Sequence, residues 1–291
     1  MREIIVNNNS YAASMISRTG GRKENQDHCM GHSLRGSDQS NILLLSVCDG
    51  MGGLAGGKTA SRIAVETIDQ VVTSKIATIA QNSDDGVLDI LREAIEKANA
   101  AIFKRSLDDE VVRGMGTTTA TMLITPRAAY IAHVGDSRCY ILRKSKKVFR
   151  TFDHSRVFEL VKMGVITEEE ARTSGNANII SKALGIKKVV DVELQMAEYR
   201  KGDRIIICCD GIWNTMPEDQ LIRLFCKCEH NEDATDAIAN EVDRLGKESG
   251  LDYDNLSVIV ADMKVNSNYK TPFSQKFSEL IKNINIFHKK K

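Results

Sequence analysis

The sequence predicts an α+β domain built in layers, in which an antiparallel sheet packs on a second sheet or on helices. The apolar, β-favouring runs between residues 118 and 143 are separated only by Pro126-Arg127 and by Gly135-Asp136-Ser137. Such short connections join antiparallel neighbours, because a parallel crossover needs a dozen or more residues. Long segments with helical periodicity lie on both sides of these runs.

Six runs are expected to be strands because they are rich in apolar and β-branched residues. These are 41–48, 118–124, 129–134, 138–143, 204–209 and 256–263. Four segments are expected to be helices because apolar residues recur in them at helical spacing. These are 58–80, 87–103, 217–227 and 234–246. Pro217 suits the first turn of the third helix.

The composition is ordinary for a globular protein, with 42% hydrophobic and 27% charged residues among 291. This length allows one large domain or two small ones. The net charge of +1 provides no global attraction to nucleic acid. No apolar stretch has membrane-spanning length, and the N-terminal apolar run is too short for a secretory signal. We therefore expect a cytoplasmic protein that binds no nucleic acid, and we expect a monomer.

The seven cysteines include no C-x-x-C pair, which argues against a disulfide framework and against a thiolate zinc site. Cys48, Cys208 and Cys209 lie in apolar runs, where cysteine acts as a small hydrophobic residue. The six histidines show no H-x-x-x-H pairing, so a zinc hydrolase gains no support.

Residues 264–291 form a basic segment with seven lysines and one acid, Glu279. Apolar residues recur in it at helical spacing. Two interpretations stay open. The segment is either an amphipathic helix that binds an anionic membrane surface or a partner protein, or a terminal helix that covers its own domain or frays.

Five aspartates lie at the ends of apolar strands or in the turns beside them. A single Asp-Gly is most often only a turn, but strand ends are where a rigid scaffold presents loop chemistry. Convergent carboxylates repel one another, and divalent cations relieve that repulsion. Ligation by oxygen alone suits magnesium or manganese. The five are Asp27, Asp49, Asp136, Asp210 and Asp254.

Two such ions could share a water, lower its pKa and set up in-line attack on phosphorus. The glycine after Asp49 lets the backbone approach closely and frees the Gly50 carbonyl to ligate. A site of this kind also needs a cation for the phosphoryl oxygens. Arg22, five residues before Asp27, is the candidate, because its planar guanidinium binds phosphate in bidentate fashion. The alternative is that Arg22 is an ordinary surface arginine.

A competing interpretation is a P-loop nucleotide site, because GGLAGGKT at 52–59 matches G-x-x-x-x-G-K-[ST] and RIIICCD at 204–210 resembles a Walker B strand. Two features argue against it. Gly50 and Met51 separate the strand end at Asp49 from the motif. P-loop domains are also built on parallel sheets, whereas the 118–143 runs predict antiparallel pairing. We therefore expect Lys58 to have no role in nucleotide binding.

Eight motifs occur in the order and approximate spacing of the metal-dependent serine/threonine protein phosphatases, also called PPM or type 2C. From about Ser10 to Met263 the chain resembles this family, and in particular its bacterial branch. The motifs are RKENQD, VCDGMGG, GMGTT, HVGDSR, DHS, ALG, DRIIICCDGIW and DNLSVIV.

The resemblance implies a central β-sandwich of two antiparallel sheets flanked by helices, a four-layer αββα fold with a binuclear metal site at one end. Residues 1–263 would be the catalytic domain and 264–291 a tail. The implied activity is hydrolysis of phosphoserine and phosphothreonine on proteins by direct attack of a metal-bridging hydroxide. The implied cofactors are two Mn²⁺ or Mg²⁺ ions and a third, weaker ion. A serine/threonine kinase in the same signalling pathway is the implied antagonist.

The resemblance also assigns roles residue by residue. Asp49 and the Gly50 carbonyl match the bridging metal ligands. Asp27, Asp210 and Asp254 match the other carboxylates of the metal pair. Three further roles are implied: Asp136 for the third ion, Arg22 for phosphate, and residues 157–178 for the variable flap beside the cleft.

Three positions depart from the family pattern. Gln26 replaces a common glutamate, and its amide can still orient a metal-bound water. Met51 replaces the histidine that acts as general acid in many eukaryotic members, so we expect a metal-bound water to protonate the leaving group. Asn214 replaces a common aspartate, from which nothing follows. All metal carboxylates are retained, which argues against a non-catalytic module that only binds phosphorylated partners.

Overall fold

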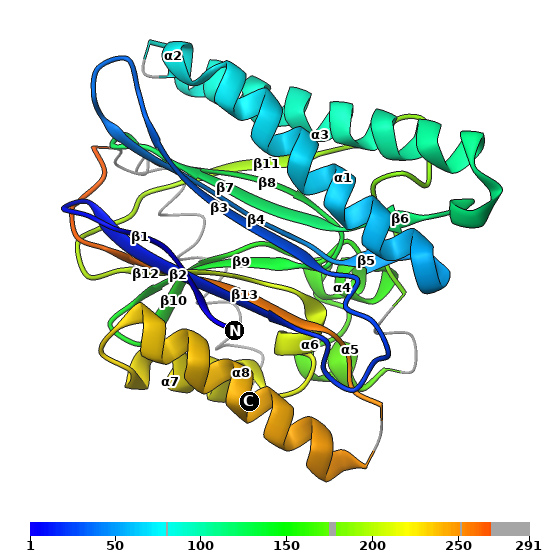
Figure 1. The fold of residues 1–291 in the computed structure, drawn as a ribbon. Coiled ribbons are helices and arrows are strands. Elements are labelled where there is room, and N and C mark those ends of the chain that lie inside the picture. Colours follow the sequence, from blue (N-terminus) through cyan, green and yellow to red (C-terminus); the bar gives the residue numbers. More distant parts are fainter. Residues whose placement is uncertain (80, 175–178, 251, 269–291) are drawn as a thin grey trace.

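The computed structural model describes residues 1–79, 81–174, 179–250 and 252–268. Two antiparallel sheets pack face to face, and helices cover both outer faces (Figure 1). The predicted α+β sandwich, with its four-layer αββα order, is therefore confirmed.

The first sheet has six strands in the order β1-β2-β13-β12-β9-β10. Every neighbouring pair in it is antiparallel. Its central strands, β12 and β13, are two of the predicted apolar runs. The bounds are β1 Glu3–Asn7, β2 Tyr11–Arg18, β9 Arg138–Arg143, β10 Lys146–Arg150, β12 Arg204–Cys208 and β13 Leu256–Met263.

The second sheet has five strands in the order β11-β8-β7-β4-β3, again all antiparallel. A short pair, β5 with β6, extends beyond the end of β4. The bounds are β3 His28–Arg35, β4 Asn41–Cys48, β5 Gly50–Met51, β6 Gly116–Thr117, β7 Thr119–Ile124, β8 Ala129–Val134 and β11 Glu193–Ala197.

Helices α1 and α3 cover the five-stranded sheet, and α7 and α8 cover the six-stranded one (Figure 1). Local signals define some of their ends: Ser83 caps α3 by accepting from the Gly86 N–H at 3.1 Å, and α8 ends at Gly250 with φ of 66°. The bounds are α1 Gly53–Ser74, α2 Ile76–Ile79, α3 Asp84–Asp108, η1 Glu110–Val112, α4 Arg156–Lys162, α5 Glu168–Thr173, α6 Asp210–Trp213, α7 Glu218–Lys227 and α8 Asn231–Ser249.

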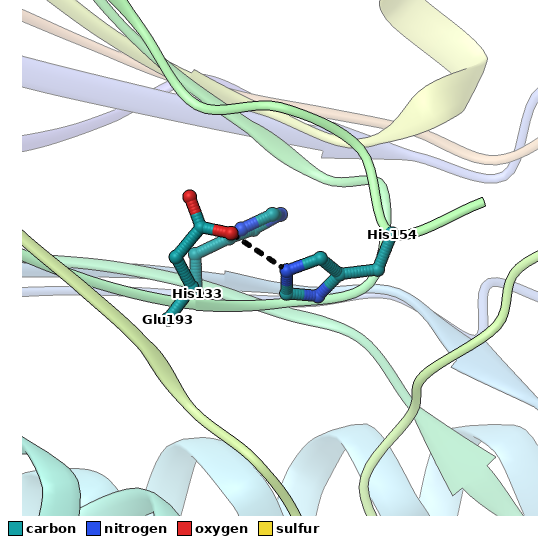
Figure 2. A group of neighbouring side chains, drawn as sticks. All are labelled: His133, His154 and Glu193. Carbon is teal, nitrogen blue, oxygen red and sulfur yellow. Dashed lines mark hydrogen bonds and ion pairs between the residues drawn. The ribbon is translucent and has the colours of Figure 1, made fainter. Parts of the chain in front are cut away.

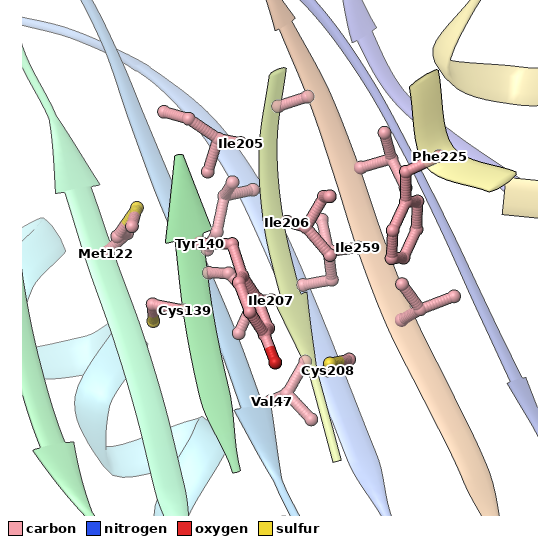
Figure 3. Close-up of a cluster of buried hydrophobic side chains, with 14 of the residues drawn as sticks. Val47, Met122, Cys139, Tyr140, Ile205, Ile206, Ile207, Cys208, Phe225 and Ile259 are labelled. Atoms are coloured by element: carbon pink, nitrogen blue, oxygen red, sulfur yellow. The ribbon is translucent and has the colours of Figure 1, made fainter. Parts of the chain in front are cut away.

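The buried strand β4 contributes to both apolar layers of the molecule. Its alternate side chains Leu43, Leu45 and Val47 lie in a cluster that fills the space between the sheets and continues under α7 and α8 (Figure 3). Ile42 and Leu44 lie in the second cluster, between the five-stranded sheet and α1 and α3. Burial on both faces explains why this strand is a continuous apolar run.

One expected pairing is wrong. The runs 129–134 and 138–143 were predicted to be antiparallel neighbours, but β8 and β9 belong to different sheets. The chain crosses from one sheet to the other through Gly135, whose φ is +106°. A short connection can therefore join stacked sheets as well as adjacent strands, and apolar pattern alone does not distinguish the two cases.

Five longer strands were not predicted from sequence: β1, β2, β3, β10 and β11. β3 reads HCMGHSLR and β11 reads ELQMA, so neither has a strong apolar run. β1, β3, β10 and β11 lie at sheet edges, where one side of a strand remains unpaired. Their strand state depends on pairing with a neighbour more than on composition.

The predicted tail is described only at its start. Lys264 N–H donates to the Ser10 carbonyl, and Ser267 N–H donates to the Tyr199 carbonyl, each at 2.9 Å. Residues 269–291, where the amphipathic helix was expected, lie outside the described residues. Among the helices of the described part, none is long and apolar enough to cross a membrane.

Candidate functional site

All five predicted aspartates lie where strands end or begin. Their carboxyl groups are close enough to affect one another electrostatically: Asp49 faces Asp27, Asp210 and Asp136, and Asp210 faces Asp254. The positions are Asp27 before β3, Asp49 between β4 and β5, Asp136 between β8 and β9, Asp210 at the start of α6, and Asp254 before β13.

Asp27 is buried, with 5% of its surface exposed. Burial raises the pKa of its carboxyl, and the charges of Asp210 and Asp254 raise it further. The Ser257 and Cys209 side chains oppose this effect, but within the described residues neither carboxyl oxygen of Asp27 has a hydrogen-bond partner of ordinary geometry. Asp210 Oδ1 is buried and unpartnered there in the same way. Buried carboxylate oxygens of this kind require a cation or a proton.

The backbone around Asp49 is held by the threonines that open β7. The Asp49 N–H donates to Thr118 Oγ1 at 3.0 Å. The Asp49 carbonyl accepts from the Thr118 N–H at 2.9 Å and from Thr117 Oγ1 at 2.8 Å. These bonds fix the backbone from which the Asp49 side chain extends toward Asp27 and Asp210. Burial raises the pKa of Asp49 well above its usual range, as do the nearby carboxyls.

Gly50 lies in a space that a Cβ would fill. Such an atom would be 2.1 Å from the Gly57 carbonyl oxygen and 2.5 Å from that of Gln26. Gly57 is equally confined, because a Cβ there would lie 2.6 Å from Gln26 Oε1 and 2.7 Å from the Gly50 oxygen. The glycines at the start of α1 therefore allow the helix to approach Gly50 closely.

Asn255 organises the loop that carries Arg22 and Gln26, and the sequence analysis gave it no role. Its side-chain amide donates to the Thr19 carbonyl at 2.7 Å and to that of Glu24 at 2.9 Å, and its Oδ1 accepts from the Gln26 N–H at 2.8 Å. The available signal was its place directly after Asp254 in the motif DNLSVIV.

Arg22 forms a bidentate ion pair with Asp254. Nη2 lies 2.8 Å from Oδ2 and Nε lies 3.1 Å from Oδ1. Both side chains are about half exposed, at 51% and 41%. The fork that was predicted to bind phosphate therefore binds a carboxylate of the same site, and the pair is accessible enough to exchange one anion for another.

Asp136 reaches the group from the crossing between the sheets. Asp136 is 5% exposed, and burial raises the pKa of its carboxyl well above its usual range, with the charge of Asp210 adding to the effect. Trp213 Nε1 donates to the Asp136 carbonyl at 2.9 Å. The next residue, Ser137, shares a 2.7 Å hydroxyl contact with Thr118, which also binds Asp49. The same threonine thus connects two of the aspartate loops.

The residues present fit a divalent-cation site. The donor set consists of carboxylate oxygens and one confined backbone carbonyl, which is the chemistry of magnesium and manganese sites. The unpartnered buried oxygens of Asp27 and Asp210 lie where such ions would neutralise them. Asp27, Asp49 and Cys209 also offer donor atoms within 4.8 Å of one another.

The fold contradicts the P-loop interpretation. The strand before GGLAGGKT is β4, which is flanked by antiparallel neighbours. Lys58 forms an ion pair with Glu24, with Nζ 2.9 Å from Oε1. The motif match is a coincidence of glycines that are needed for close packing.

The described part of the predicted flap, residues 157–178, includes most of α4 and all of α5. It lies at the end of the sandwich beside α6 (Figure 1), where the Phe158 and Trp213 ring centroids are 6.4 Å apart. Arg150, which is 7% exposed, connects it to the domain by pairing with Glu168 of α5 and Glu218 of α7. A pocket of about 540 Å³ between α4 and α5 is lined in part by Leu160 and Ile166. Residues 175–178 lie outside the described residues.

Comparison with known proteins gives one family. The model of the family described as protein phosphatase 2C matches residues 18–245. Among curated relatives, the serine/threonine phosphatase stp of Listeria monocytogenes is 28% identical over 241 residues, which span 83% of this chain and 91% of that protein.

Solved structures agree with the sequence match. The crystal structure of the serine/threonine phosphatase Stp1 from Staphylococcus aureus is similar with a TM-score of 0.72 and 30% identity, covering 86% of this chain and 94% of that one. The catalytic domain of the serine/threonine protein phosphatase PstP, solved in complex with two manganese ions, is similar with a TM-score of 0.69 and 26% identity, covering 87% and 98%.

Proposed function

The chain belongs to the protein phosphatase 2C family, and from this premise we propose that its five convergent aspartates form the active site. The chain is a metal-dependent serine/threonine protein phosphatase. Its substrates are phosphorylated proteins. One observation supports the location of the reaction above all others: buried carboxylate oxygens of Asp27 and Asp210 meet at one end of the sandwich without partners among the described residues.

We assign metal ligation to the oxygen donors of this end. Asp49, the Gly50 carbonyl and the carboxylates of Asp27, Asp210 and Asp254 would hold two ions. Asp136 would bind a third ion. Mn²⁺ and Mg²⁺ are the proposed ions, because hard cations prefer all-oxygen sites. Bound there, they would supply Lewis-acid charge and activate a water for attack on phosphorus.

The other residues bind and orient the substrate. Arg22 would bind two phosphoryl oxygens through its guanidinium group in place of the Asp254 carboxylate that it contacts now. The Asp254 carboxylate would then be available to a metal ion. Gln26, whose Oε1 faces Gly57, would contribute an outer hydrogen bond at the metal edge. Direct transfer of the phosphoryl group to water needs no covalent enzyme intermediate, and none of these residues is assigned a nucleophilic role.

The test compares Asp210→Asn with Lys58→Ala. Asp210→Asn should lower Mn²⁺-dependent hydrolysis of a phosphothreonine peptide by more than about 100-fold, beyond what loss of an outer hydrogen-bonding residue costs. Lys58→Ala, which removes only the partner of Glu24, should retain wild-type turnover. An Asp210→Asn enzyme with wild-type rates would refute the site. Wild-type protein that binds the phosphopeptide tightly without turnover would favour the binding-module alternative.

The cellular setting is part of the same proposal. We place the enzyme in the cytoplasm as a monomer that opposes a serine/threonine kinase. Phosphoproteomes of cells carrying active enzyme and Asp210→Asn enzyme should differ in phosphoserine and phosphothreonine sites shared with one kinase. Tail binding to a membrane surface or partner would be tested separately, by truncation after Asn268.

A further inference from the structure

A second cluster of titratable side chains lies outside the aspartate group. His133 on β8, His154 before α4 and Glu193 at the start of β11 offer donor atoms within 4.8 Å of one another (Figure 2). Both histidines are buried, at 0% and 5% exposure, and their rings lie 4.5 Å apart between centroids. His133 and His154 lie in the motifs HVGDSR and DHS, but separations of 21 and 39 residues along the chain do not predict that they meet Glu193.

The hydrogen bonds of His154 determine which of its ring nitrogens carries the proton. The Gly135 N–H donates to Nδ1 at 3.1 Å, so Nδ1 must present a lone pair. Nε2 lies 3.0 Å from Glu193 Oε2 and must therefore carry the hydrogen that the carboxylate accepts. A metal ion at Nε2 would require the opposite tautomer, which would set two hydrogens against each other at Gly135. His154 and Glu193 are therefore a hydrogen-bonded pair and not ligands of a second metal centre, while neither ring nitrogen of His133 has a hydrogen-bond partner of ordinary geometry among the described residues.

His154 holds the Gly135 residue from both sides. Besides the ring contact with the Gly135 N–H, the His154 N–H donates to the Gly135 carbonyl at 2.8 Å. Gly135 has φ of +106°, and a Cβ there would lie 2.6 Å from a Thr118 methyl group, so its conformation is tightly fixed. The next residue is Asp136. Any movement of Gly135 would displace the Asp136 carboxylate.

The same histidine lies at the base of the flap. Its carbonyl accepts from the Ser181 N–H at 2.7 Å, which joins the chain entering the flap to the chain leaving it. Lys162, the last residue of α4, places Nζ 3.5 Å from Glu193 Oε2. The His154 hydrogen bond is the main cause that lowers the pKa of Glu193 to about 2, and burial lowers that of His133 to about 3. The His133 ring that lies beside His154, tilted by 35°, is therefore neutral, and the ionised Glu193 carboxylate accepts the hydrogen bond from His154 Nε2.

We propose that His154 is a positioning residue that fixes Gly135, and through it Asp136, relative to the base of the flap. Glu193 sets the tautomer that this requires, and Lys162 connects the flap helix to Glu193. The inference rests on the proposed function in one respect, the assignment of Asp136 to the third ion.

Substitution of His154 by Asn or by Gln distinguishes the two hydrogen bonds that the His154 ring forms. An Asn side chain can place its oxygen where Nδ1 lies, and a Gln side chain can place its amide where Nε2 lies. His154→Asn should therefore keep the bond to Gly135 and lose Glu193, whereas His154→Gln should do the reverse. In Mn²⁺ titrations followed by calorimetry, His154→Gln should weaken the weakest class of sites by about 10-fold or more, with the tighter sites unchanged. His154→Asn should stay within about threefold of wild type.

Nitrogen NMR of wild-type protein labelled at histidine provides a second measurement. It should show Nε2 of His154 protonated and Nδ1 bare, and this pattern should persist when Zn²⁺ is added. The opposite tautomer, or a Zn²⁺-induced change at Nε2, would overturn the inference. So would a Gln variant that binds Mn²⁺ like wild type, or an Asn variant as impaired as the Gln variant. Wild-type protein that binds no Mn²⁺ would instead refute the proposed function.

Discussion

The carboxyl groups of Asp27, Asp49 and Asp210 lie close together in a region with little water. Burial raises the pKa of each one, and their mutual repulsion contributes. The uncharged form is therefore stabilised in the metal-free protein, and the charged form is stabilised only when cations are present. The residues that we propose as metal ligands are thus the ones that destabilise the metal-free fold at neutral pH.

This strain predicts a pH dependence of the metal-free protein. A carboxyl whose pKa is raised in the folded state contributes stability that is complete below its ordinary pKa of 3.8 and is lost as pH rises through the raised value. In chelator, Asp27→Asn should therefore gain melting temperature over wild type as pH rises from about 4.5 to about 7.5. Saturating Mn²⁺ should reverse the ranking at neutral pH. A constant difference between the two proteins across this range would contradict the assignment.

Substitution of Arg22 should impair substrate binding without impairing metal binding. Arg22→Lys keeps the charge but loses the bidentate fork, so kcat/KM for a phosphopeptide should fall by about 100-fold. Mn²⁺ affinity and melting temperature should hardly change, because an exposed pair with Asp254 contributes at most about 1 kcal/mol. Arg62→Lys, a similarly exposed arginine paired with Glu66 on α1, is the matched control. Equal kcat/KM values for the two variants would show that Arg22 does not bind the phosphoryl group.

At the scale of elements, the approach of α1 to β5 shapes the metal edge. Gly57 touches both Gly50 and Gln26, which no other residue type could do without moving them. The helix therefore begins in a glycine-rich segment for packing reasons, and the same glycines imitate a phosphate-binding motif in the sequence.

Gly57→Ala should consequently weaken Mn²⁺ binding by about 10-fold or more, since its Cβ would displace the Gly50 carbonyl. Gly56→Ala is the matched control, because the nearest atom to its Cβ would be the Met115 Cβ at 3.1 Å, away from Gly50. Calorimetric Mn²⁺ titration of both variants measures the difference. Identical titrations would show that close packing at Gly57 has no bearing on the metal edge.

At the scale of the molecule, β4 links the two apolar layers and so should make them unfold together. Leu44 and Leu45 are both fully buried, the first under α1 and α3, the second between the sheets. Leu44→Ala and Leu45→Ala should each cost about 2–5 kcal/mol of unfolding free energy. Leu107→Ala, at a side chain 62% exposed, should cost less than about 0.5 kcal/mol.

Denaturant unfolding measures this coupling with two probes. Trp213, the single tryptophan, lies in the cluster between the sheets, and circular dichroism reports on all helices. Both leucine variants should shift the fluorescence and dichroism midpoints by equal amounts. If Leu44→Ala shifted the dichroism alone, the two layers would be independent units.

Sequence and structure agree best where burial acts on both faces of an element. β4, β12 and β13 were predicted closely, since a strand covered on both sides must be apolar throughout. The sequence also predicted that the five aspartates act together, because carboxylates beside glycine turns and strand ends have few structural uses together, and the structure brings their carboxyl groups near one another. Their role as metal ligands and that of Arg22 in phosphate binding stay predictions. Edge strands such as β3 were missed, since their pairing partner lies elsewhere in the chain.

The amino-acid sequence by itself therefore determined the layered fold, the identity of the acidic residues and the family that they resemble. Only the tertiary structure decided that β8 and β9 belong to different sheets, that Arg22 binds Asp254, and that His154 holds Gly135. The physical reason is the same in each case. The pattern of apolar and polar residues indicates whether a side chain faces water or the core. A contact between distant segments depends instead on how whole sheets are stacked.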